Sequence, residues 1–237
     1  MLNFAVQTSN LKFSIMKYSL FTCLLFISFF GFSQDCKTYY YLQNNKITEI
    51  TMYNKKGNAS GKLVYTVSDF KSTAGTSSAT LTTETFDKKG KSEIKSTGVV
   101  KCTKGVIMMD MKMSMPPGQP LGITNAKTES VFIEYPGAMK IGDDLKEAHM
   151  QIETETKGMQ QSVTLDIINR KVTGKEKVTT PAGTWDCYVI TNITKLKIKT
   201  MGIGIPMNME LTEWFAPGFG MVKTKSKYGE TLITAIR

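Results

Sequence analysis

Methionine residues are concentrated in two parts of the sequence, and their sulfur atoms could bind a metal. The two groups are Met108, Met109, Met111, Met113 and Met115, and then Met201, Met207 and Met209. If the first group lies on a β-strand, Met109, Met111 and Met113 point to one face, because side chains alternate along a strand. Thioether sulfurs are soft ligands that suit Cu(I). The spacing therefore indicates one alternative function, a Cu(I) site formed by Met109, Met111 and Met113, which Met207 and Met209 would join if they pair across from them.

Methionine also fills irregular apolar surfaces, because its unbranched thioether side chain adapts to its surroundings. A groove for an apolar ligand is the more ordinary use of the same residues. Trp185 and Trp214 each lie beside an expected hairpin tip and would stand at the mouth of such a groove. The candidate ligand-binding residues are therefore Met109, Met111, Met113, Trp185, Met207, Met209 and Trp214.

His149 is the single histidine, so most histidine-dependent chemistry is excluded. It would be an outside ligand for the methionine site, or the base of an unrecognised hydrolase if acidic residues gather beside it. The sequence contains no G-x-S-x-G, no HExxH, no EF-hand loop and no phosphate-binding glycine loop. We therefore expect no enzyme and no cofactor, with the hydrolase as a second alternative.

The elements that must position these residues are β-strands. Runs rich in threonine, aromatic and β-branched residues recur with a period of two and are separated by short connectors. About a dozen such runs are present, at 47–53, 63–68, 80–86, 93–101, 106–115, 128–135, 150–156, 162–172, 175–180, 185–199, 207–215, 221–228 and 231–236. A turn or two of helix is expected only at 143–151, which has an acidic start. The pattern predicts one all-β domain with an antiparallel sheet and little helix.

Two connectors share the sequence aromatic–Asn/Asp–Lys–Lys–Gly, at 53–57 and 86–90. The Asn or Asp side chain can accept hydrogen bonds from the following backbone, and glycine readily adopts the left-handed conformation that closes a short hairpin. Both connectors therefore predict tight hairpin turns.

The charge of the chain is basic, with 30 Lys and Arg against 20 Asp and Glu. Only Arg170 and Arg237 are arginines, whereas nucleic-acid sites favour the planar fork of that side chain. Lysines scattered along alternating strands more often keep edge strands from associating. We therefore expect no nucleic-acid partner, while attraction to an anionic membrane surface or to acidic glycans stays open.

The N-terminus has the features of a secretory signal. The uncharged apolar run 19–32 follows Lys17, and Gly31 and Ser33 are small residues that place cleavage before Gln34. The run is shorter than the roughly 20 residues of a membrane span, so we expect no stable span after cleavage. Residues 1–33 are thus an upstream extension and a cleaved signal peptide, and residues 34–237 are the mature domain. The start codon, Met1 or Met16, stays open.

Two other interpretations of the N-terminus are a retained membrane anchor and a lipoprotein signal. Lipidation would fall on Cys36 or Cys23, but neither is preceded by a complete lipoprotein motif.

Three cysteines remain after removal of the signal: Cys36, Cys102 and Cys187. An exported protein forms disulfides, and one bridge with one buried thiol is the simplest arrangement. A Cys36–Cys102 bridge is favoured, because it would tie the mature N-terminus to the sheet, although the sequence leaves the pairing open. Cys187 lies in a strand pattern, where a free cysteine behaves as a small apolar residue.

Two motifs in the second half of the chain are the most specific parts of the sequence. They are TPAGTWDCY at 180–188 and EWFAPGFGMVK at 213–223. Together they resemble the TapB-like family of exported bacterial proteins, a domain of unknown function. The resemblance implies a small envelope protein with a strongly curved antiparallel sheet or an open or half barrel. It implies no catalytic residues.

These observations lead to one expected function. We expect a non-enzymatic protein of the periplasm or cell envelope, which binds an apolar ligand, a lipid or an envelope protein on a curved sheet. The oligomeric state is left open.

Overall fold

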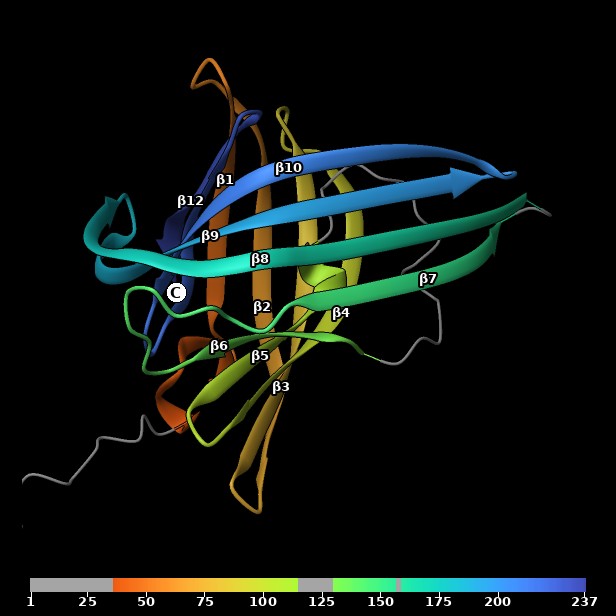
Figure 1. Cartoon of the computed structure of the whole chain (residues 1–237). Helices are drawn as coiled ribbons and strands as arrows, with labels where there is room; N and C mark the ends of the chain where they lie inside the picture. Colours follow the sequence, from red (N-terminus) through yellow and green to blue (C-terminus); the bar gives the residue numbers. More distant parts are fainter. Residues whose placement is uncertain (1–35, 115–129, 157–158) are drawn as a thin grey trace, which may run out of the picture. The chain divides into compact units, whose positions relative to one another are not determined.

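Twelve antiparallel strands form one sheet in the part of the chain that the structure describes (Figure 1). They are β1 (Ile47–Asn54), β2 (Ala59–Thr73), β3 (Thr76–Asp87), β4 (Ser92–Thr103), β5 (Val106–Asp110), β6 (Phe132–Pro136), β7 (Ala148–Thr156), β8 (Met159–Thr180), β9 (Gly183–Thr200), β10 (Ile203–Ala216), β11 (Gly220–Ser226) and β12 (Gly229–Ile236). Three short 3-10 helices accompany them: η2 (Cys36–Thr38), η3 (Tyr40–Leu42) and η4 (Met111–Ser114). The all-β fold class expected from the sequence is confirmed.

This computed structural model describes residues 36–114, 130–156 and 159–237. The expected signal peptide and Met115 lie outside the described residues. The compact unit to which the sheet belongs spans residues 34–237. Among the described residues, no helix has the length and apolar character needed to cross a membrane.

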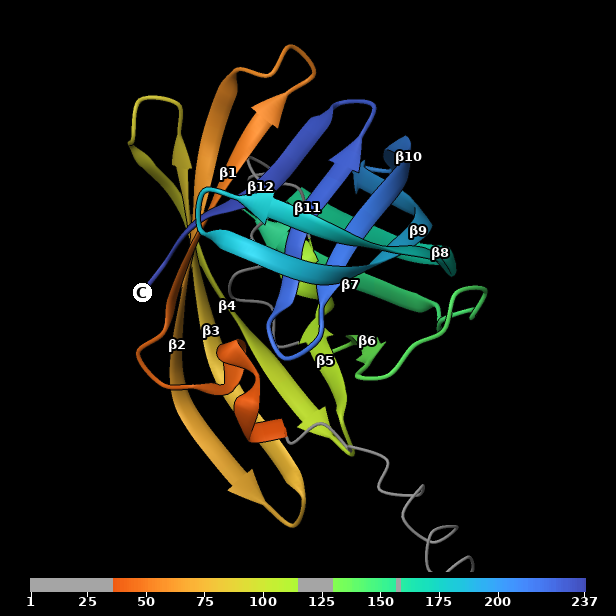
Figure 2. The ribbon, with the colours of Figure 1, turned by 90° about the vertical axis from the view of Figure 1, so that its left-hand side faces the viewer.

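The strand order places the middle of the chain at the two edges of the sheet. The order is β6-β5-β4-β3-β2-β1-β12-β11-β10-β9-β8-β7, so the first and last strands pair at the centre. The strands β6 and β7 follow one another in the chain but are the opposite edges. Figures 1 and 2 show that β7–β10 cross over β2–β4, and the sheet is nearly closed into a barrel. Contacts between the two edges of the sheet therefore involve residues in or near β6 and β7.

Alternating burial makes one face of the sheet the interior. In β3 every second residue is buried, from Ser77 to Thr85, as expected for a half-buried strand. Apolar residues from both halves of the chain reach zero exposure on this face: Leu81, Val100, Ile107, Leu165, Ile190 and Phe215. Each fully buried side chain of this size stabilises the fold by about 1.5–3 kcal/mol.

The two expected hairpin turns are present and use the expected chemistry. Asn54 Oδ1 accepts hydrogen bonds from the backbone N–H groups of Lys56 and Asn58. Asp87 Oδ1 does the same for Lys89 and Lys91, at 2.8 Å each. The following glycine of each turn has a positive φ, which favours a residue without a Cβ.

The helix expected at 143–151 is wrong. The Asp143 side chain accepts a hydrogen bond from the backbone N–H of Lys140 and closes a turn instead. The backbone then pairs with β8, because Leu145 N–H donates to the carbonyl oxygen of Arg170 and Val172 N–H donates to that of Asp143. The acidic residue Asp143, which would suit a helix N-terminus, therefore stabilises a turn.

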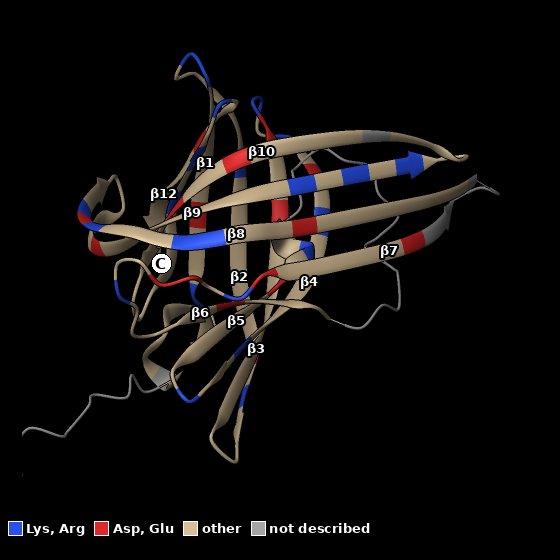
Figure 3. Cartoon of the chain, in the orientation of Figure 1, with Lys and Arg blue, Asp and Glu red and all other residues tan. Residues whose placement is uncertain are grey.

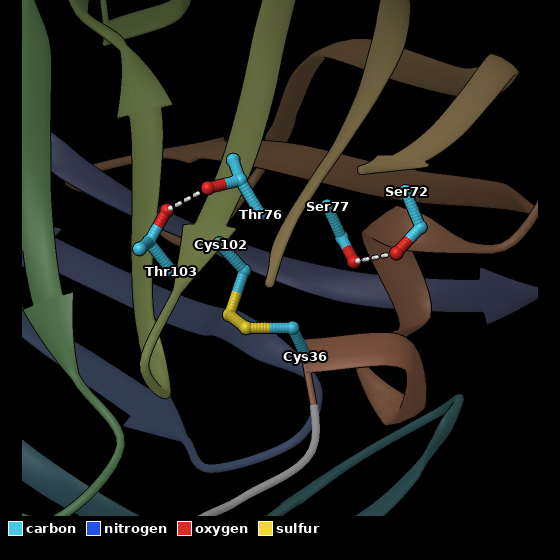
Figure 4. Close-up of a disulfide and its surroundings, with 6 residues drawn as sticks. All are labelled: Cys36, Ser72, Thr76, Ser77, Cys102 and Thr103. Carbon is cyan, nitrogen blue, oxygen red and sulfur yellow. Dashed lines mark hydrogen bonds between the residues drawn. A yellow bond between two sulfur atoms is a disulfide. The ribbon is translucent and has the colours of Figure 1, made fainter. Parts of the chain in front are cut away.

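Cys36 and Cys102 form a disulfide, the pairing favoured from the sequence (Figure 4). The bridge joins η2 to β4. The following residues, Tyr39 and Tyr41, are fully buried, and the Tyr41 ring lies 5.6 Å from that of Phe219. The N-terminal segment is thus held on the sheet by one covalent bond and a cluster of aromatic rings.

Candidate functional site

Arg170 is the largest fully buried side chain of the described residues, with 1% exposure. A bulge in β8 explains its position. The register shifts between Ile168 and Lys171, and Asn169 has a left-handed φ of 53°. Before the bulge the buried residues are odd-numbered, as at Ile167, and after it they are even-numbered, as at Val172. The extra residue therefore turns Arg170 to the interior, although regular alternation would point it to solvent.

Inside the sheet, Arg170 joins the two edges. Its Nη1 donates to the carbonyl oxygen of Glu134 on β6, at 3.0 Å, and to that of Lys146, just before β7, at 2.6 Å. Its guanidinium carbon lies 4.8 Å from the centre of the Tyr135 ring. Within the described residues, its Nε and Nη2 have no hydrogen-bond partner. Two of the three guanidinium nitrogens thus have no hydrogen bond of good geometry, although the guanidinium lies close enough to the Tyr135 hydroxyl to lower the pKa of that group.

A chain of polar side chains runs from Arg170 across the interior. The Tyr135 hydroxyl donates to Glu213 Oε2 at 3.1 Å, and Asn192 Nδ2 donates to Glu213 Oε1 at 3.0 Å. Thr194 Oγ1 in turn donates to Asn192 Oδ1. The Tyr135 ring also stacks on Phe215, with 4.8 Å between ring centres. The site thus contains one buried cation, one carboxyl group and a set of oriented neutral groups.

Burial controls the protonation of this site. Desolvation raises the pKa of the Glu213 carboxyl, and the Arg170 charge and the two hydrogen bonds only partly oppose this effect. Desolvation and the nearby Glu213 raise the pKa of Tyr135 well above its ordinary value, against the effect of Arg170. Arg170 itself stays charged, because a guanidinium is not deprotonated in proteins. The unpaired N–H groups of Arg170 can therefore donate hydrogen bonds to an anionic oxygen, such as that of a carboxylate or a phosphate.

Apolar side chains continue the inner face of β10 beyond this site. From Glu213 the next inner positions are Leu211, Met209 and Met207, which pair with Asn192, Thr194 and Leu196 of β9. All three are only half-buried. Inner positions on a strand are about 7 Å apart, so these side chains form a wall about 14 Å long. The sequence had identified Met207 and Met209, and the structure places both in this wall.

The two tryptophans expected at the mouth of the groove lie elsewhere. Trp214 points to the outer side of β10, where its Nε1 hydrogen-bonds with Glu176 and Lys223 lies over its ring. Trp185 packs against Phe219, with 5.4 Å between ring centres, as part of the aromatic cluster at the N-terminal segment. The structure therefore does not bring either residue together with Met207 and Met209.

The first methionine group spans two elements. Met109 is on β5, whose last residue is Asp110, while Met111 and Met113 belong to η4. The strand ends there because Asp110 Oδ1 accepts a hydrogen bond from the Lys112 backbone and begins the 3-10 turn. The expected continuous strand 106–115 is therefore wrong, and so is the shared face that depended on it.

The condition under which Met207 and Met209 would join the first group is not met, because β10 pairs with β9 and β11 and not with β5. Met111 is fully buried, and Met113 packs on Gly98. A Cu(I) site at Met109, Met111 and Met113 stays an untested prediction. The described residues contain no group of three or more His, Cys, Asp or Glu that could hold a metal ion.

His149 and Cys187 are two further side chains with reactive groups. His149 lies on β7, is exposed, and hydrogen-bonds through Nδ1 with Asp166 of β8. Cys187 is free and buried, and burial together with Asp186 and Glu176 raises the pKa of its thiol to about 12. Cys187 is therefore a neutral thiol at physiological pH and behaves as an apolar residue.

The fold and the site define a class of protein: a nearly closed antiparallel barrel whose interior contains a buried arginine and an apolar wall. Two solved structures share this fold. One is a Bacteroides fragilis protein provisionally described as exported, with a YmcC-like fold; it is 19% identical, with a TM-score of 0.63 over 82% of this chain and 96% of its own. The other is a Parabacteroides distasonis protein provisionally described as a lipoprotein; it is 19% identical, with a TM-score of 0.67 over 84% of this chain and 98% of its own.

A family model identifies the chain more closely. The chain belongs to the DUF3108-like family, whose model matches residues 43–231. The match includes every strand that contributes to the interior site. No curated protein matches the sequence at a significant level.

Proposed function

We propose that this chain is an exported, non-enzymatic protein of the periplasm or cell envelope that binds an amphipathic molecule inside its curved sheet. The acidic head of the molecule would contact Arg170, and its hydrocarbon part would lie along the inner face of β10. One observation carries the proposal: Arg170 is 1% exposed, yet its Nε and Nη2 have no partner among the described residues.

The energetics of Arg170 favour a bound anion. A buried polar group without a partner costs about 1–3 kcal/mol, and more when it is charged. Arginine presents N–H donors in a planar fork that matches carboxylate and phosphate oxygens. Nη1 already binds two carbonyl oxygens, so Nε and Nη2 are the donors left for a ligand. An acidic head group at this point would remove the penalty.

The apolar wall supports a hydrocarbon chain as the rest of the ligand. Leu211, Met209 and Met207 extend from Glu213 in one direction and stay half-buried. The adaptable methionine side chain suits a flexible hydrocarbon. A fatty acid or a single-chain lipid therefore fits the two parts of the site better than a purely apolar molecule or a protein partner.

A titration with oleate tests the proposal. Native mass spectrometry of protein purified from its envelope first reports any bound lipid. Oleate should then bind the delipidated protein in isothermal titration, whereas methyl oleate, which lacks the anion, should bind about tenfold more weakly or worse. Equal binding of the two ligands would rule out Arg170 as the anchor.

Two substitutions on β10 separate ligand binding from folding. Met209→Glu places a charge on the inner wall, and Asn208→Glu places the same charge on the exposed outer face of the same strand. Only the first should weaken oleate binding, again by about tenfold or more. If both variants bind oleate as the parent does, the hydrocarbon does not lie on this wall.

Export and the narrower family assignment are part of the same proposal. The motifs at 180–188 and 213–223 support the TapB-like assignment. Sequencing of the mature N-terminus should begin at Gln34. A palmitate label at Cys23 would instead favour the lipoprotein alternative, because the Cys36 sulfur is already bonded to Cys102.

A further inference from the structure

The hairpin between β9 and β10 ends in an apolar tip. Met201 is 74% exposed and Ile203 is 77% exposed, more than any other large apolar side chain among the described residues. Gly202 between them has a positive φ and no side chain that would cover them. Figure 1 shows this hairpin extending away from β1–β4. Two large apolar side chains are thus presented at one projecting turn.

A row of lysines leads to this tip. Lys195, Lys197 and Lys199 alternate along β9 with buried or half-buried residues and are all exposed, so they face the outer side of the sheet. Figure 3 shows the alternating basic positions on β9. In the part of the chain that the structure describes, none of them forms an ion pair. A Cβ placed on Gly204 would lie 3.0 Å from Lys199 Cγ and 3.1 Å from Lys197 Cε. The side chains of Lys197 and Lys199 therefore lie over Gly204 of β10, next to the tip.

More positive charge gathers on the same outer face. A hollow of about 730 Å³ beside Lys195 is also lined by Lys225 and Lys227, and Glu210 is the one acidic residue in its lining. The partners of the lysine row on β8 are Asp166, Thr164 and Ser162, so only Lys195 faces an acid across the strands. The outer face of β7 adds Glu153, which pairs with Ser162, so the five lysines of the row and the hollow outnumber the described acidic side chains Asp166, Glu153 and Glu210.

We infer that the β9–β10 hairpin docks on an anionic lipid surface. Met201 and Ile203 enter the head-group region, while the lysines beside them contact lipid phosphates. An apolar edge flanked by lysines is the combination that binds membrane interfaces, because hydrophobic burial and attraction to anionic lipids then act together. A nucleic acid would use the lysines but not the apolar tip. The inference stands independently of ligand binding inside the sheet.

Vesicle co-sedimentation tests the inference. The exported form of the protein should pellet with vesicles made of equal parts phosphatidylcholine and phosphatidylglycerol, and far less with phosphatidylcholine alone. Raising the salt concentration should weaken binding, because exposed charges are screened. Equal pelleting with both vesicle types, or no pelleting with either, would overturn the inference. A retained lipid or apolar anchor would give the first of these results.

Matched variants locate the contact on the protein. The double substitutions Met201→Ser with Ile203→Ser, and Lys197→Glu with Lys199→Glu, should each weaken vesicle binding by about tenfold or more. The controls make the same kinds of change elsewhere: Lys55→Glu with Lys56→Glu in the β1–β2 turn, and Tyr228→Ser in the β11–β12 turn.

All these positions are exposed, so the variants should keep their folding, as measured by circular dichroism. Vesicle binding that is unchanged in the tip and lysine variants, or equally reduced in the controls, would contradict docking by this hairpin. Oleate titration of the same variants without vesicles distinguishes failure of docking from failure of ligand binding.

Discussion

The guanidinium of Arg170 lies 4.8 Å from the ring centre of Tyr135, although β8 and β6 are not neighbours in the sheet. The contact brings an inner strand of the second half of the chain against the edge strand of the first. Two hydrogen bonds from the same guanidinium to Glu134 and Lys146 add to it. Arg170 therefore holds together the seam that the strand order leaves open.

Replacing Arg170 should open this seam. Arg170→Met fills a similar volume but removes the hydrogen bonds to the carbonyl oxygens of Glu134 and Lys146. Each loss costs about 1–3 kcal/mol, and removal of the two unpaired buried donors offsets part of it, so we expect the free energy of unfolding to fall by about 1–3 kcal/mol. Urea denaturation measures this loss, and hydrogen exchange should show faster opening of β6. Unchanged exchange in β6 would mean that other contacts hold the edge.

The pH dependence of stability should report on Glu213. Because burial raises its pKa above the ordinary value of 4.5, the folded protein holds this proton to a higher pH than the unfolded chain does. Stability from this group is therefore complete below the ordinary value and is lost as the pH rises through the folded pKa. Glu213→Gln removes the titration, so the variant should gain stability relative to the parent between acidic and neutral pH.

Urea denaturation at acidic and neutral pH makes this comparison. Glu210→Gln, at an exposed position on the same strand, is the control and should follow the parent at both pH values. A parallel pH dependence of Glu213→Gln and the parent would show that the pKa of Glu213 is the same in the folded and the unfolded protein.

Much of the fold was predictable, because apolar and polar residues alternate in the sequence where the strands have one buried face. The strands at 185–199 and 207–215 correspond to β9 and β10, and two turns could be predicted from Asn54 and Asp87. These features depend on local chemistry alone. The strand at 106–115 fails where Asp110 bonds with the backbone of Lys112 and starts a 3-10 turn, which competes with strand pairing.

The interior site was only half predictable. Met207 and Met209 follow from alternation, but Arg170 depends on a bulge that changes which residues face inward. One signal was available: the apolar positions change from odd numbers up to Ile167 to even numbers at Val172, around an asparagine that tolerates a left-handed φ. The partners of Arg170 depend on long-range closure of the sheet, which no local pattern encodes.

Loss of the Cys36–Cys102 disulfide should destabilise the protein strongly. The bond closes a loop with a sequence separation of 66 residues, for which chain entropy gives about 4 kcal/mol. Replacing both cysteines with serine should lower the free energy of unfolding by about that amount in urea. Reducing agent should lower the stability of the parent in the same way and leave the double variant unchanged. If the reducing agent affects both proteins equally, the effect does not come from this bond.

Gly220 should tolerate alanine far less well than its neighbour Gly218. Both have a positive φ, but a Cβ on Gly220 would lie 2.7 Å from Cε2 of the Tyr41 ring, whereas a Cβ on Gly218 meets nothing within 4 Å. Tyr41 is 1% exposed and packs against Phe219, so its ring has no space to move away.

We expect Gly218→Ala to cost about 1 kcal/mol of backbone strain and Gly220→Ala about 3 kcal/mol, because overpacking is added to the strain. Urea denaturation gives the two free energies, and near-ultraviolet circular dichroism reports the environment of the tyrosine rings. Equal losses in the two variants would show that the Tyr41 ring adapts.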